Sequence, residues 1–237
     1  MLLKTINRYG WLAAIAIGAA PLSAGTVSFF LQPTAAYVSS TTLLPITDPE
    51  GSTLTSISDS HLTISFVSGG SPLPMDVSVT PDSWATWGAP PNTESSTPTV
   101  VHPDDPAVTT VLFQFSSALT TFGIEVEPDD TSAAHDITAT FLSNGSSVGV
   151  LQRSVDGNGG ALLFAGTGDG FDSVEVSSDI DFAAAQFRYS LAPAVPEPSS
   201  GLLVVAGAAA AAFCRIRRAA SHRAAKKLRA AVGGRPQ

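Results

Sequence analysis

The chain has 237 residues, enough for one domain of roughly 150 to 170 residues plus terminal segments. A hydrophobic content of 44% and a mean hydropathy of +0.23 argue against a chain that its charge keeps disordered. The formal net charge of −8 is unevenly distributed, because residues 25–194 hold nineteen acidic residues against Arg153 and Arg188 alone, a net charge of −17. This sign excludes nucleic acid as a partner of the middle of the chain.

The N-terminus has the order of a secretory signal peptide. Lys4 and Arg8 make the first residues positive, residues 11–20 form an apolar run, and Ala24 is a small residue at the cleavage position. A helix of ten residues extends only about 15 Å, half of a bilayer core. We therefore predict a signal peptide over residues 1–24 that is cleaved after Ala24. The alternatives are an uncleaved anchor helix or a buried helix of the fold.

The middle of the chain has the alternation of β-strands. In residues 61–68, Leu62, Ile64 and Phe66 alternate with polar neighbours, which predicts a strand with one buried face. The same period of two predicts strands at 110–115, 122–126, 137–142, 148–153, 161–165, 173–177 and 183–189.

Turn signals separate these strands, at Asn144-Gly145, at residues 156–160 and at residues 166–170. Because no stretch of the middle shows a sustained helical period, we predict an all-β domain over residues 25–194, an antiparallel, jelly-roll-like β-sandwich. Residues 69–106 hold eight prolines, and we interpret them as a long ordered excursion over one sheet edge.

One pair of carboxylates is a candidate for acid–base chemistry. Glu125 and Glu127 lie two apart on a predicted strand and therefore point to the same face. The alternation equally explains them as the solvated face of a half-buried strand. The histidines show no metal-binding spacing, and the chain has neither a nucleophile elbow nor a phosphate loop. We predict that the protein is not an enzyme, with a secreted hydrolase as an alternative.

Calcium is the metal that the acidic turns suit best, because oxygen ligands bind hard cations. The candidate ligands are Asp129, Asp130, Asp136, Asp156 and Asn158. The sequence from Asp156 begins like a calcium loop but lacks the later ligands. The alternative is an acidic surface without a specific site, and no other cofactor is predicted.

Trp84 and Trp87 lie in the irregular part of the middle. Exposed in a loop, they could stack on sugar rings, which would make the domain a carbohydrate-binding module. Buried, they would close one end of the core, which is the interpretation we favour.

The C-terminus has three parts in a fixed order. Pro196-Glu197-Pro198 excludes a helix interior, residues 201–213 carry no charge, and a basic stop of Arg215, Arg217 and Arg218 follows. With Cys214 the apolar run reaches about 21 Å, less than the usual ~30 Å span. This predicts a membrane-retention segment over residues 195–218, whose apolar run forms a short membrane helix that retains the chain temporarily, and a basic cytoplasmic tail over residues 219–237.

This order resembles the PEP-CTERM sorting signal of Gram-negative bacteria. The resemblance rests on the Pro-Glu-Pro motif, the apolar run and the arginine stop, and the chain continues further after Arg218 than is usual in that family. Residues 118–190 also resemble, by pattern, the β-domain commonly found upstream of such signals. The resemblance implies export, an inner-membrane intermediate, and processing by an exosortase-type protease. It also implies a final place at the cell surface or outside the cell, in association with exopolysaccharide or biofilm.

Overall fold

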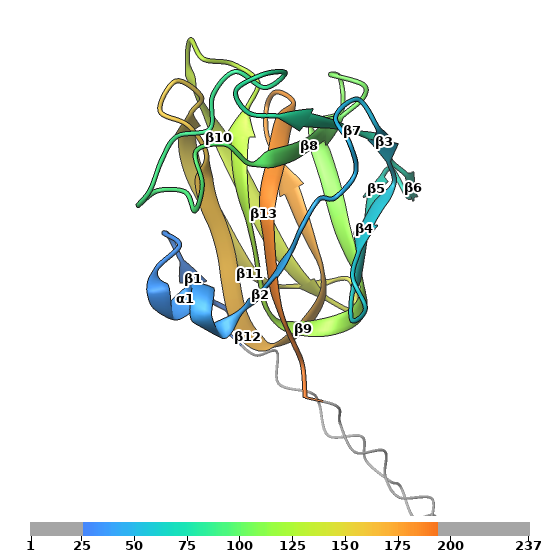
Figure 1. Ribbon diagram of the computed structural model, residues 1–237. Coiled ribbons are helices and arrows are strands. Elements are labelled where there is room, and N and C mark those ends of the chain that lie inside the picture. The colour runs from blue at the N-terminus through green and yellow to red at the C-terminus, as the bar shows by residue number, and fades with distance from the viewer. Residues whose placement is uncertain (1–25, 194–237) are drawn as a thin grey trace, which may run out of the picture. The chain divides into compact units, whose positions relative to one another are not determined.

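The computed structural model describes residues 26–193, which form an antiparallel all-β domain (Figure 1). The predicted signal peptide, sorting motif, apolar run and basic tail lie outside these residues. Within the described part of the chain, no helix is long and apolar enough to cross a membrane.

The described elements are labelled in Figure 1. In chain order they are β1 (Ser28–Phe30), α1 (Ala35–Ser40), β2 (Thr42–Leu44), β3 (Thr53–Leu54), β4 (Ser56–Ser58), β5 (Thr63–Ser68), β6 (Ser71–Pro72), β7 (Met75–Val79), β8 (Thr99–Pro103), β9 (Thr110–Pro128), β10 (Ala134–Ser143), β11 (Ser146–Asp156), β12 (Leu162–Ser177) and β13 (Phe182–Leu191).

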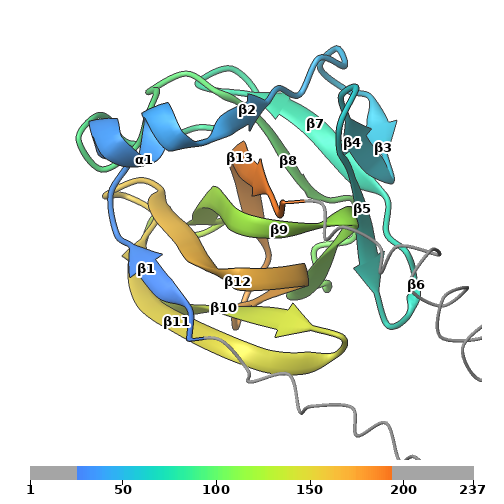
Figure 2. The same ribbon diagram turned by 90° about the horizontal axis from the view of Figure 1, so that it is seen from below.

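All thirteen strands of the described residues belong to one antiparallel sheet, and two long strands, β9 and β12, connect its two layers. The first part of β9 pairs with β5 and its last part pairs with β13, while β12 lies along its other edge. In the same way β12 pairs with β1 near its start and with β10 near its end. Phe66 of β5 and Phe187 of β13 have ring centroids 6.4 Å apart, although their strands do not pair. The layers therefore face each other across the core, and Figure 2 shows β9 and β12 between β10–β11 and β7–β8.

The strand alternation predicted the core correctly. Leu62, Ile64 and Phe66 are buried, and so are the alternating apolar residues of β9 and β10. Phe113 lies at the centre, with its ring 5.9 Å from that of Phe66 and 5.7 Å from that of Phe187. Rings at these distances and inclined to one another contribute stability beyond the area that they bury.

The structure confirms one hairpin turn and corrects another. Asn144 and Gly145 connect β10 to β11 with φ values of 51° and 74°, the left-handed pair that a tight hairpin turn requires. The turn predicted at residues 166–170 is wrong, because these residues lie inside β12. The pairing of β12 with β9 shifts register between Thr167 and Phe171, so the glycines form a bulge in a continuing strand.

The proline-rich segment is more regular than predicted. It contains β7 and β8, which pair with each other from Met75 opposite Pro103 to Val79 opposite Thr99. The connection between them, residues 80–98, is called the strap below. It covers the face of the sheet rather than an edge, because its Trp87 packs with Ala161, Ala183 and Ala185.

Candidate functional site

Glu125 is buried under the strap. It lies on the opposite face of β9 from the main core and is 0% exposed, so its predicted solvated position is wrong. Its Oε2 accepts a hydrogen bond from Trp87 Nε1 at 2.8 Å, and its Oε1 accepts one from the backbone N of Glu94 at 2.6 Å. Burial raises the pKa of Glu125 to about 7, although both hydrogen bonds favour the charged form.

Glu127 is buried beside it and is less well paired. The Thr86 hydroxyl lies within hydrogen-bonding reach of both Glu127 Oε1 and the Gly157 carbonyl, the latter at 3.2 Å. A hydroxyl has one hydrogen, so both contacts are satisfied when a protonated Glu127 donates to Thr86 and Thr86 donates to Gly157. Glu127 Oε2 is buried without a partner. Burial raises the pKa of Glu127 to about 7, and the charge of Asp129 adds to the shift.

A second polar layer holds the strap from the side. The single Nε–H of Arg188 on β13 is shared between the two carboxylate oxygens of Glu94 in the strap, at 2.7 and 2.8 Å. Arg188 also donates to the carbonyls of Val38 and Thr41, at 3.2 and 3.3 Å. The buried Tyr37 hydroxyl nearby has no hydrogen-bond partner, and burial raises the pKa of Tyr37. This cluster therefore fastens the strap, the α1 region and β13 to one another.

The two tryptophans form part of this cover. Trp87 is 1% exposed and Trp84 is 8% exposed, so neither offers an open ring face for the predicted sugar stacking. The burial agrees with their interpretation as core residues. Trp87 holds Glu125, and its carbonyl accepts a hydrogen bond from Ala161 at 2.9 Å.

The predicted calcium ligand Asp130 has a different partner. Its Oδ2 lies 3.1 Å from His135 Nε2, and Asp179 Oδ1 lies 2.9 Å from the Nδ1 of the same ring. The hydrogen bonds from Ser132 and then from His135 lower the pKa of Asp130 to about 2, and the hydrogen bond to Asp130 raises that of His135. A protonated His135 thus links the turn after β9 to the turn after β12.

The other proposed ligands do not form a group of three around a common point. Gln152 Nε2 donates to Asp136 Oδ2 at 3.4 Å, and Asp156 Oδ1 accepts from the backbone N of Asn158 at 3.0 Å. Asp129 lies on the border of a surface pocket. In residues 26–193 no three Asp, Glu, His or Cys side chains are grouped to hold a metal ion. The structure gives the calcium prediction no support.

The pocket beside Asp129 is acidic, with a volume of about 370 Å³. The indole of Trp84 and the imidazole of His102 lie against each other at its wall, 5.3 Å between centroids. Burial and then the charge of Asp129 raise the pKa of Asp181. The lining comprises Ser83, Trp84, Ala85, His102, Pro103, Asp104, Pro106, Asp129 and Asp181. Such a lining favours a neutral or cationic group.

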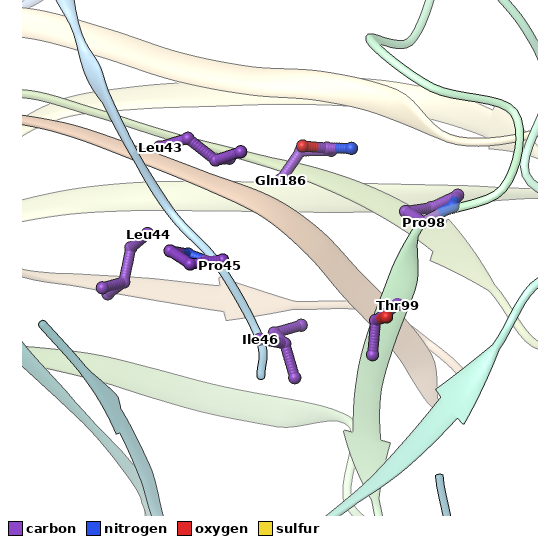
Figure 3. A pocket seen from close by; sticks show the side chains of 7 residues that line it. All are labelled: Leu43, Leu44, Pro45, Ile46, Pro98, Thr99 and Gln186. Carbon is purple, nitrogen blue, oxygen red and sulfur yellow. The ribbon is translucent and has the colours of Figure 1, made fainter. Parts of the chain in front are cut away.

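A smaller pocket of about 160 Å³ lies where β13 exchanges one partner strand for another (Figure 3). Gln186 has a φ of 51°, between the residues of β13 that pair with β8 and those that pair with β2. A non-glycine residue in this region costs about 1–2 kcal/mol, which the surrounding strands must hold. Figure 3 shows its amide between Leu43 and Pro98. The volume is below the roughly 300 Å³ of ordinary ligand pockets.

Sequence reasoning identified Glu125 and Glu127 as a pair and Trp87 separately, and it did not bring the tryptophan together with the pair. It missed Thr86, Glu94 and Arg188 as their partners. The one available signal was the position of Arg188, one of only two basic residues in an acidic domain.

No protein-family model matches the chain, and no curated protein matches it. Among solved structures, the chain is similar to the enzymatically active domain of tailspike protein 4 from bacteriophage CBA120, with 15% sequence identity and a TM-score of 0.29. The similarity covers 56% of this chain and 19% of that chain. A likeness this low carries no argument about activity.

Proposed function

We propose that the protein is an exported, non-enzymatic protein of the cell surface or its polysaccharide matrix, delivered by a PEP-CTERM sorting signal. The observation that carries the proposal is the fixed order of Pro196-Glu197-Pro198, the apolar residues 201–213 and the basic stop from Arg215. The fold supports it, because β13, the last strand of residues 26–193, ends at Leu191, a few residues before the motif.

In this proposal the apolar run retains the exported chain in the inner membrane. An exosortase-type protease then recognises the Pro-Glu-Pro motif and processes the tail. Released from the membrane, the acidic domain of residues 25–194 reaches the surface or its exopolysaccharide. The jelly-roll order of its two layers stays a prediction.

The burial of the glutamate pair argues against the hydrolase alternative, which would use these two carboxylates. A hydrolase would need Glu125 and Glu127 in contact with substrate and water. Both are sealed under the strap by Trp87 and Thr86, and neither lines any of the three pockets described for residues 26–193.

The sorting signal can be tested in the producing cell. We expect replacement of Pro196, Glu197 and Pro198 by alanine to leave the chain unprocessed and in the membrane fraction. The control replaces Ser199 and Ser200, which directly follow the motif, and should process normally. Mass spectrometry of the mature protein and cell fractionation measure both. An unchanged mass and location in the first variant would contradict the proposal.

Carbohydrate binding is the second candidate function. The observation that favours it is the acidic pocket, where Trp84 and His102 lie among hydrogen-bonding side chains. A glycan array with the purified full-length protein is expected to give signals that Asp129→Asn and Asp181→Asn weaken. An array without signal would refute this candidate and leave the sorting proposal intact.

A further inference from the structure

Arg153 is the cation of the domain that no carboxylate neutralises. Residues 26–193 contain two arginines and no lysine. Arg188 is paired with Glu94, whereas Arg153 takes part in none of the ion pairs of the described residues. A lone positive charge among nineteen acidic residues needs a specific explanation.

Hydrogen bonds to backbone carbonyls hold the guanidinium of Arg153 in place. Arg153 shares the inner face of β11 with the buried Leu151 and Val155. Its Nη1 donates to the carbonyl of Leu31 at 3.0 Å and to that of Leu163 at 2.7 Å. These bonds use both hydrogens of Nη1. Among the described residues, the hydrogens on Nε and Nη2 have no protein acceptor.

A pocket of about 500 Å³ lies in front of this arginine. Its other walls are Phe29, Phe30, Leu31, Gln32 and Thr34, at and after β1. Leu31 is 52% exposed, the side chain of a large apolar residue open to solvent. The lining thus offers a fixed guanidinium edge, apolar surface, and the amide and hydroxyl groups of Gln32 and Thr34.

We propose that this pocket binds a carboxylate-bearing sugar, a uronate residue of an acidic polysaccharide. The carboxylate accepts two parallel hydrogen bonds from Nε and Nη2 of Arg153, the fork geometry that guanidinium and carboxylate share. The apolar carbon face of the sugar ring packs against the phenylalanine and leucine walls. Partial burial strengthens the charge-assisted bonds, and the same burial lowers the pKa of Arg153. This inference rests on the proposed association with polysaccharide and names the residues that make the contact.

The charge of the domain makes the expected salt dependence unusual. A net charge of −17 repels an anionic glycan at long range. Salt shortens the Debye length from about 30 Å at 0.01 M to about 8 Å at 0.15 M, which screens this repulsion more than the short contact to Arg153. We therefore expect the affinity to hold or rise as salt is added. Binding by the basic tail would instead weaken steeply.

Calorimetry with the full-length protein tests the proposal, with a trimer of galacturonate as probe and a neutral glucose trimer as its control. Leu31→Glu places a carboxylate at the pocket rim and keeps Arg153 and its backbone bonds. Leu191→Glu makes the same charge change at an exposed leucine that does not line the pocket. We expect Leu31→Glu to weaken uronate binding about tenfold or more and Leu191→Glu to leave it nearly unchanged.

Several results would overturn the inference. These are no uronate binding, equal binding of the neutral trimer, equal binding of an acetylated dipeptide with a free carboxylate, or a Leu31→Glu variant that binds like wild type. A steep loss of affinity with salt would assign the binding to the basic tail. All of these leave the processing test of the sorting motif unaffected, so the two proposals fail separately.

Discussion

The free energy of unfolding is expected to fall by several kcal/mol as the pH rises from about 5 to about 9. The folded state binds more protons than the unfolded chain wherever a pKa is raised by folding, and stability then falls with pH. Burial raises the pKa values of Glu125 and Glu127 from 4.5 to about 7. Each glutamate contributes about 3 kcal/mol of stability. This contribution is present in full at a pH below the pKa of the group in the unfolded chain, and it is lost as the pH rises through the pKa of the group in the folded domain.

The other titrating groups set the acidic side of this profile. The raised pKa of His135 acts in the same direction as the two glutamates. The lowered pKa values of Asp59, Asp130 and Asp179 act in the opposite direction, because their contribution is lost only as these carboxylates are protonated in acid. We therefore expect the stability maximum near pH 5, measured by urea unfolding over a pH series.

Two matched variants distinguish the effect of a buried glutamate from that of an exposed glutamate on the pH profile of stability. Glu127→Gln removes one buried titration, and its amide can donate to Thr86 as the protonated carboxyl does. It should therefore flatten the profile, with stability close to that of the wild type in acid and higher than that of the wild type in alkaline buffer. Glu175→Gln makes the same change on an exposed side chain of β12 and should leave the profile as it is. A wild-type profile without slope between about pH 5 and 9, or equal effects of the two variants, would refute the burial of an ionisable pair under the strap.

Trp87→Ala is expected to destabilise the domain by about 4 kcal/mol or more. The side chain is 1% exposed, and removal of a buried tryptophan costs about 3–5 kcal/mol. It also removes the donor to Glu125 Oε2, which leaves a buried carboxylate oxygen unpaired at a cost of about 1–3 kcal/mol. Denaturant unfolding measures the loss, a large fraction of the 5–15 kcal/mol that holds an ordinary domain together.

Trp87→Phe distinguishes the hydrogen bond from the packing. Phenylalanine fills most of the site and donates nothing, so the pKa of Glu125 should rise further. The loss in Trp87→Phe is therefore expected to be larger in alkaline than in acidic buffer. Leu191→Ala, at a side chain 42% exposed, serves as the surface control and should change stability by less than about 0.5 kcal/mol. Equal losses for Trp87→Phe at both pH values would show that Glu125 does not depend on the indole.

The acidic residues show where sequence reasoning stopped. Alternation correctly placed Phe122, Ile124 and Val126 on the core face of β9, and it separated Glu125 and Glu127 onto the other face. It could not show whether that second face meets water or protein. The answer depends on residues 80–98, whose prolines give no strand or helix period. Their contacts with β9 join residues 31 to 41 positions apart in the sequence.

The glycines of β12 likewise show that local sequence does not decide whether the chain reverses direction. Local sequence predicts a turn at residues 166–170, because glycine lowers the cost of reversing the chain. Whether such a segment reverses or bulges depends on the strands on either side. Here β9 pairs with β12 before and after the bulge, so the strand continues.

The sequence by itself determined the uneven charge, the strand faces of the core and the hairpin at Asn144-Gly145, because each depends on residues close together in the chain. The tertiary structure decided that the outer face of β9 is covered. It also decided that the two arginines differ, one buried against Glu94 and one held open by the carbonyls of Leu31 and Leu163. These outcomes are contacts between distant segments, and burial, which sets both the pKa values and the accessible charge, exists only once those segments have packed.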